Sequence, residues 1–131
     1  MGSNDIEEEI KACGADVAPR ITPQDIEANI ASEWYFTADD GVTGDIAALV
    51  IVGNPDAMLE IVSKGADLPD VLSLLTFCVL VLRNGFTVTG ESACVSPENF
   101  NAEIGRKVAR ANAVQKIWPL MGYALKERLS A

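Results

Sequence analysis

The 131-residue chain contains no histidine. Histidine is the most common general base in enzymes and a frequent ligand of zinc. Its absence excludes Ser-His-Asp and Cys-His catalytic sets, and also any zinc site built from cysteine and histidine together. No other catalytic motif stands out, so we expect a protein that is not an enzyme and that holds neither a metal ion nor a cofactor.

Cysteine and long apolar runs are also scarce. The three cysteines, Cys13, Cys78 and Cys94, are odd in number and show no CxxC spacing, which predicts reduced thiols, with Cys78 as a small core residue. No run approaches the ~20 apolar residues that span a bilayer, so we expect no membrane association. The chain contains neither GxGxxG nor a P-loop.

Charge is unevenly distributed along the chain. Net charge is −9, yet residues 1–70 carry 15 acids and 3 bases, whereas residues 71–131 carry 4 acids and 7 bases. This acidic excess argues against direct binding of nucleic acid or of an anionic membrane. Residues 1–20 predict an acidic, flexible arm, which leaves 21–131 as one domain.

Residues 74–93 predict a β-hairpin. Two apolar runs flank Arg83-Asn84-Gly85, and Asn-Gly favours a type I′ turn, in which both central residues have φ > 0. The first run is almost continuously apolar, which predicts a strand covered on both faces. The second alternates polar and apolar residues, which predicts a half-exposed strand.

The hairpin is followed by a predicted long helix over about 97–118. Ser96 is a suitable N-cap and Pro97 a suitable first helical residue. Pro119 is expected to end or kink this helix before a shorter C-terminal helix over about 121–129. The apolar stripe that should face the core consists of Phe100, Ile104, Val108, Ala111, Val114 and Trp118.

The N-terminal half predicts further helices. Thr22 and Pro23 are typical of a helix start, and apolar residues at helical spacing extend the expected helix to about 37. Residues 42–70 are interpreted as a variable linker, with one helix from about 43 and another over 54–65. The fold class is therefore α+β: a hairpin, which a strand from a partner chain could extend, packed by helices.

Six residues are candidates for a binding site. Arg106 and Arg110 are four residues apart on the long helix, so they share a face that is either simply solvated or able to bind a phosphate or carboxylate. Glu91 and Ser92 follow the hairpin and could mark a cleft. Trp34 and Tyr35, in the densest aromatic cluster, could plug the hairpin or form a surface for stacking or partner binding.

Several segments resemble a known family. NGFTVTGESAC at 84–94, PENFNAEIGRKVA at 97–109 and KIWPLMGY at 116–123 closely resemble the phage gene-49-like family, small proteins named after gene 49 of a coliphage and gene 66 of another enterobacterial phage. The segment 21–41 is similar to the N-terminal part of that family. The resemblance implies an origin in a tailed phage or prophage, and implies no particular activity.

We therefore expect a phage-encoded, non-enzymatic protein in the host bacterial cytoplasm. It would bind a host protein or complex to counter defence or redirect host machinery. One alternative is a protein that sequesters a small nucleotide signal, with Arg106 and Arg110 on the phosphate and Trp34 or Tyr35 on the base. A second alternative is a minor virion or assembly component. An apolar strand with an open edge also predicts a homo-oligomer.

Overall fold

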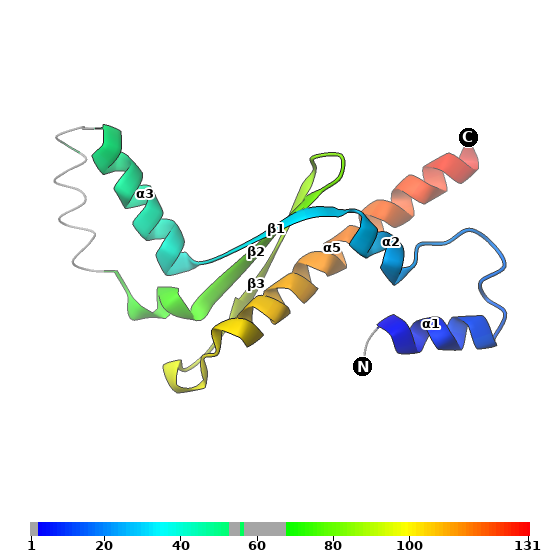
Figure 1. Ribbon diagram of the computed structural model, residues 1–131, viewed down its shortest axis with the longest axis horizontal. Coiled ribbons are helices and arrows are strands. Elements are labelled where there is room, and N and C mark those ends of the chain that lie inside the picture. The colour runs from blue at the N-terminus through cyan, green and yellow to red at the C-terminus, as the bar shows by residue number, and fades with distance from the viewer. Residues whose placement is uncertain (1–2, 53–55, 57–67) are drawn as a thin grey trace.

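The computed structural model describes residues 3–52, 56 and 68–131. Within these ranges the fold is α+β, as predicted: a three-stranded antiparallel sheet with helices (Figure 1). The predicted helix over 54–65 lies outside the described residues. The elements are α1 (Ser3–Ala12), α2 (Pro23–Ala28), β1 (Ile30–Thr37), α3 (Ala38–Val52), η1 (Asp70–Leu74), β2 (Leu75–Leu82), β3 (Thr87–Ala93), η2 (Pro97–Asn99) and α5 (Ala102–Ser130).

The predicted hairpin is confirmed, but its turn is of another kind. β2 and β3 pair antiparallel around Arg83, Asn84 and Gly85. Gly85 has φ of 88° and no residue other than glycine has positive φ among the described residues, so the turn is not type I′. The Gly85 N–H donates to the Leu82 carbonyl at 2.9 Å, which is typical of a three-residue loop with glycine in the left-handed region.

The third strand of the sheet comes from the same chain, so no partner chain is needed to extend the hairpin. β1 pairs antiparallel with β2 and makes β2 the central strand. The helix predicted to reach about residue 37 was wrong, because α2 ends at Ala28 and Asn29 caps it. Ile30 onward is rich in aromatic and β-branched residues, which favour a pleated strand over a helix.

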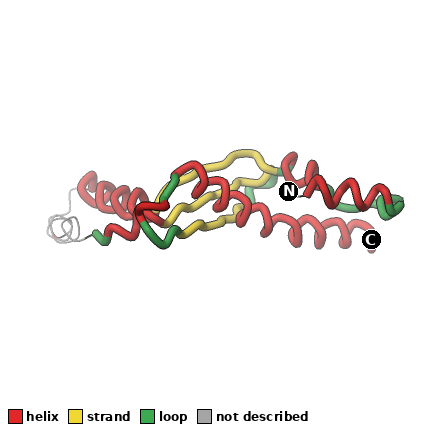
Figure 2. Tube along the Cα trace, turned by 90° about the horizontal axis from the view of Figure 1, so that it is seen from below, coloured by secondary structure: helices red, strands yellow, loops and turns green. Residues whose placement is uncertain are grey.

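Helix α5 lies across one face of the sheet, here called the inner face (Figure 2). The predicted apolar stripe of α5 was right only in part: Val114 and Trp118 pack against the core, but Ile104 and Val108 are exposed. The buried positions of the helix are Gly105, Ala109, Ala113 and Ile117. Close packing explains this choice. A Cβ on Gly90 would lie 2.2 Å from the Ala109 carbonyl oxygen, so only small side chains allow the helix backbone to approach β3.

The start of α5 and its passage through Pro119 also differ from the prediction. Pro97 belongs to the separate 3-10 turn η2, and Asn101 caps α5 by accepting a hydrogen bond from the Ile104 N–H at 3.0 Å. The helix continues through Pro119 to Ser130. Pro119 and Gln115 are both exposed, so the Gln115 carbonyl that lacks its helical partner can be hydrated, which makes the proline tolerable.

The central strand is covered on one face rather than on both. Its residues alternate between buried and half-buried along the whole of β2. Thr76, Cys78, Leu80 and Leu82 are buried beneath α5 and belong to the inner face. Among the described residues no element lies across the opposite face, here called the outer face (Figures 1 and 2). Only the start of α3 approaches one end of it, where a Cβ on Gly41 would lie 3.4 Å from the Phe36 ring. The apolar residues that continue the run in β2 therefore remain partly accessible there.

Local capping joins α3 to the end of β1, and one ion pair joins α1 to the segment before α2. Thr37 and Asp40 exchange hydrogen bonds of 3.0 and 3.1 Å at the start of α3, so the helix predicted from about residue 43 begins earlier, at Ala38. The acidic N-terminal arm contains α1, where Glu7 accepts two hydrogen bonds from Arg20 at 2.9 and 2.6 Å. The flexibility of this arm stays a prediction.

Candidate functional site

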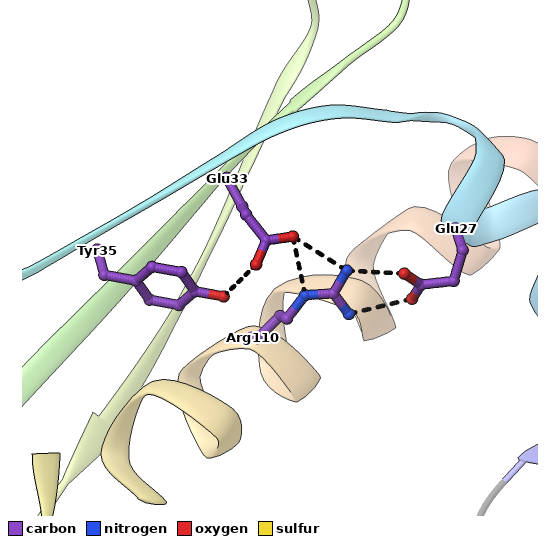
Figure 3. A network of polar contacts seen from close by, with 4 residues as sticks. All are labelled: Glu27, Glu33, Tyr35 and Arg110. Atoms are coloured by element: carbon purple, nitrogen blue, oxygen red, sulfur yellow. Dashed lines mark hydrogen bonds and ion pairs between the residues drawn. The ribbon is translucent and has the colours of Figure 1, made fainter. Parts of the chain in front are cut away.

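Arg110 is the centre of a polar network on the inner face (Figure 3). Its guanidinium donates two parallel hydrogen bonds to Glu27 of α2, at 3.0 and 2.7 Å. It donates two more, both 3.3 Å, to one carboxylate oxygen of Glu33 in β1. The other oxygen of Glu33 accepts from the Tyr35 hydroxyl at 2.7 Å. The network therefore links α5 to α2 and β1.

Hydrogen bonds and burial shift the pKa values of Glu27 and Tyr35 in this network. The hydrogen bonds from Arg110 lower the pKa of Glu27. Burial, together with the hydrogen bond to Glu33, raises the pKa of Tyr35. At neutral pH Glu27 is therefore ionised and the phenol of Tyr35 keeps its proton, and the single arginine has two carboxylate side chains as partners. Four of the five N–H groups of Arg110 point at carboxylates, which leaves little capacity for a ligand anion.

Arg106 lies one helical turn before Arg110 and faces the same strand. Its guanidinium carbon is 5.9 Å from the centroid of the Tyr35 ring, which is the range of a cation–π contact. The structure thus brings together Tyr35, Arg106 and Arg110, three of the six predicted site residues. Their partners Glu27 and Glu33 were missed, because acids in one part of the sequence give no local signal of a pairing with a later helix.

Trp34 lies on the outer face, away from the two arginines. Its indole is 61% exposed and its position in β1 is opposite Val79 in β2. Phe36 is 39% exposed and stacks on Phe77, with ring centroids 5.3 Å apart. Adjacent residues of β1 alternate between the two faces of the sheet, which separates Trp34 from Tyr35. A nucleotide site that combines Trp34 with Arg106 and Arg110 is therefore not formed.

The outer face is apolar across two strands. Its side chains come from alternate positions of the paired strands, and Glu91 at the β3 side is its one charged member. The Trp34 indole N–H donates to the Ser32 hydroxyl at 3.0 Å, so the polar atom of this aromatic already has a partner. The members of this face are Ser32, Trp34, Phe36, Leu75, Phe77, Val79, Val81, Thr87, Thr89, Glu91 and Ala93.

Glu91 and Ser92, adjacent in sequence, point to different faces of the sheet. The Glu91 carbonyl accepts a hydrogen bond from the Asn112 side chain at 2.7 Å, on the β3 side of α5. Ser92 lines a small inner cavity of about 170 Å³ together with Cys94. Arg106 and Arg110 reach β1, on the other side of the central strand. Glu91 and Ser92 therefore do not share one site with Arg106 and Arg110.

The outer face could have been found from the sequence through one signal. Ile30–Thr37 contains Trp34 and Phe36 two residues apart, which is the period of a strand. The same segment also fits helical spacing from Ile26 through Ile30 to Trp34, and that spacing predicts the longer helix instead. Once the segment is assigned to a strand, the two aromatics fall on one side and Tyr35 on the other.

Comparison with protein families completes this description. Residues 21–129 match the family described as Phage protein (N4 Gp49/phage Sf6 gene 66). The chain belongs to this phage family. The match begins just before α2 and includes β1, the hairpin and nearly all of α5, so both faces of the sheet are part of the family region. The searches of curated proteins and of solved structures each found no match.

No helix within residues 3–52 or 68–131 is both long and apolar enough to cross a membrane.

Proposed function

We propose that this phage-family protein acts by binding a host protein through the outer face of its sheet, without catalysing a reaction. The observation that carries the proposal is the exposed apolar patch around Trp34, Phe36 and Phe77. Contiguous apolar surface of this kind in a soluble domain is typical of a protein-binding site. Tryptophan in particular is enriched among residues that dominate binding energy.

The internal hydrogen bond of Trp34 strengthens the argument for an apolar partner. A buried indole N–H without an acceptor would cost binding free energy. Here Ser32 already accepts that hydrogen bond, so the partner need not supply a polar group. The stacked pair Phe36 and Phe77 is held by two strands, so little side-chain entropy is lost on association.

The distribution of charge suggests which partners are favoured. The outer face has a single charged residue, Glu91, whereas the chain as a whole has net charge −9. An apolar patch within an acidic surface fits a host protein whose own patch is rimmed by basic residues, as in proteins that handle nucleic acid. We propose that the encounter takes place in the bacterial cytoplasm, and that it blocks a defence component or redirects host machinery.

The decisive experiment compares variants of two exposed apolar sites. Tagged wild-type protein is used to capture partners from host lysate, and the recovered protein is then purified and titrated against each variant. Trp34→Thr combined with Val79→Thr should abolish binding, because threonine preserves strand propensity but removes the apolar patch. Val95→Thr is the matched control, because Val95 is 96% exposed outside the sheet.

Two results would refute the proposal. One is unchanged affinity of the double variant for the purified host protein. The other is a wild-type protein that sediments as a dimer, a double variant that sediments as a monomer, and no host protein that competes with dimer formation. The outer face would then be an interface between two copies of this chain.

A further inference from the structure

A cavity remote from the outer face combines arginine side chains with an apolar floor. It has a volume of about 510 Å³ and lies between α2, the hairpin turn and the C-terminal half of α5. This volume falls in the range that holds small ligands. Its lining residues are Arg20, Ile21, Asp25, Ala28, Asn29, Arg83, Met121, Ala124, Leu125 and Arg128.

Two of the three arginines that line this cavity, Arg83 and Arg128, have no carboxylate partner among the described residues. Arg20 is paired with Glu7, and elsewhere Arg110 is paired with Glu27 and Glu33. Neither Arg83 nor Arg128 forms an ion pair with any carboxylate of the described residues. Acids outnumber bases by 19 to 10 in this chain, so two arginines that lack a carboxylate and line one cavity are notable.

Local contacts orient Arg83 without using its terminal nitrogens. Its Nε donates to the Ala28 carbonyl, and its backbone N–H donates to the Asn29 carbonyl at 3.0 Å. These contacts bind the hairpin turn to the end of α2 and leave the two terminal amino groups of the guanidinium for another acceptor. Asp25, the acid in the lining, already accepts from the Thr22 N–H at 2.9 Å in the cap of α2.

Another part of the lining is apolar. Ile21, Met121 and Leu125 contribute hydrophobic surface, and Ile21 and Met121 pack against the core. A simple inorganic anion would use the arginines but would leave this surface in contact with water. A ligand that fits both parts has an anionic group at one end and a largely apolar or planar body.

We propose that this cavity binds a small organic phosphate of nucleotide size. The phosphate accepts hydrogen bonds from Arg83 and Arg128, because guanidinium groups match phosphate oxygens in pairs. The body of the ligand lies on Ile21, Met121 and Leu125. The site uses neither Arg106, Arg110 nor the outer face, so it is independent of host-protein binding.

The test uses the full chain and measures melting temperature and calorimetric affinity with four probes. The probes are adenosine 5′-monophosphate, guanosine 5′-monophosphate, adenosine and inorganic phosphate. At least one nucleotide should raise the melting temperature in proportion to the logarithm of its concentration, with smaller rises from adenosine and inorganic phosphate. Arg128→Gln should weaken nucleotide binding at least about ten-fold, the usual loss for a charge-assisted hydrogen bond.

Arg106→Gln is the matched control, because it removes an equal charge outside the cavity. Arg83→Gln should also weaken nucleotide binding. If Arg83→Gln unfolds because it loses the contact with Ala28, Arg128→Gln alone provides the test. The proposal is overturned if no nucleotide raises the melting temperature, if inorganic phosphate raises it equally, or if Arg128→Gln and Arg106→Gln have the same effect.

Discussion

The two faces of the sheet use similar apolar residues in different ways. On the inner face Cys78 and Leu80 are completely buried against a helix with alanine and glycine at its contact positions. On the outer face Trp34 is 61% exposed although it is among the largest apolar residues in the chain. The inner face is therefore shaped for close packing within the chain, whereas the outer face presents large side chains that another molecule could cover.

This difference separates stability from binding. Substitutions on the inner face should lower the free energy of unfolding strongly, while equivalent substitutions on the outer face should change it little and affect partner binding instead. Neighbouring residues on one strand point to opposite faces, so the tests at Gly90 and Leu80 each have a control one residue away.

The largest effect is expected from Gly90→Ala. The new Cβ would lie 2.2 Å from the Ala109 carbonyl oxygen and 2.3 Å from the Ala113 nitrogen, so the helix backbone would have to move. We expect a loss of about 3 kcal/mol or more in the free energy of unfolding, measured by urea denaturation. Thr89→Ala, on the outer face, should cost about 0.5 kcal/mol. Equal losses for the two variants would mean that α5 does not contact β3 closely.

Leu80→Ala should follow, with a loss of about 3 kcal/mol, because it leaves a cavity beneath α5. Leu80 has no exposed surface, whereas its neighbour Val79 is half-buried on the outer face. Val79→Ala should cost about 1 kcal/mol in the same denaturation assay. If Val79→Ala proved as costly as Leu80→Ala, the outer face would be buried in the folded protein, and the contrast between the faces would fail.

Arg110→Met should produce a moderate, pH-dependent loss. At neutral pH we expect about 1 kcal/mol, because Arg110 and Glu27 are partly exposed, with side-chain exposures of 27% and 54%. The pKa of Glu27 is lower in the folded protein than in the unfolded chain. The ion pair therefore contributes fully above the unfolded value of about 4.3, and its contribution declines as the pH falls through the lower folded value.

The difference between the urea midpoints of the wild type and Arg110→Met should thus become smaller at acidic pH. Lys107→Met provides the control, because Lys107 and Glu103 form an ion pair at 3.7 Å that is 75% and 80% exposed. That variant should change stability by about 0.3 kcal/mol at neutral pH. A difference for Arg110→Met that stayed constant between pH 7 and pH 3 would show that the ion pair does not carry the effect.

Trp34→Thr should have the smallest effect on stability, about 0.5 kcal/mol, since the indole is mostly exposed and threonine suits a strand. The contrast with its effect on host-protein binding is the informative part. Thermal and urea denaturation of the isolated protein measure the first quantity, and titration of the purified partner measures the second. A loss of stability similar to that of Leu80→Ala would place Trp34 in the core.

Local signals made the hairpin and the helical character of the C-terminal half predictable. Asn84-Gly85 between two apolar runs identifies a turn whatever the rest of the chain does, although the type I′ geometry that it predicted was wrong. The strand β1 was missed because Ile26, Ile30 and Trp34 fit a helical period, and pairing with β2 decides between the two periods. That pairing is a tertiary effect, which sequence periodicity does not contain.

The contact surface of α5 was predicted only in part, for a related reason. Hydrophobic patterns give weight to large side chains such as Ile104 and Val108, and these proved to be exposed. Close approach to Gly90 instead requires the smallest residues, so Ala109 and Ala113 form the contact. The candidate site was predicted in part. The pair Arg106 and Arg110 does share one face, but the carboxylates that neutralise Arg110 and the separation of Trp34 from it depend on how the strands are arranged.

The placement of β1 also affects how the protein folds. β2, β3 and α5 follow one another directly, so their contacts can form while little chain must be ordered. Pairing of Thr37 with Thr76, in contrast, must close the whole segment between them. We expect β1 to join last, so the free edge of β2 is exposed in the preceding intermediate. During that interval an identical chain could donate its own β1, so we expect domain swapping to be a misfolding route for this topology.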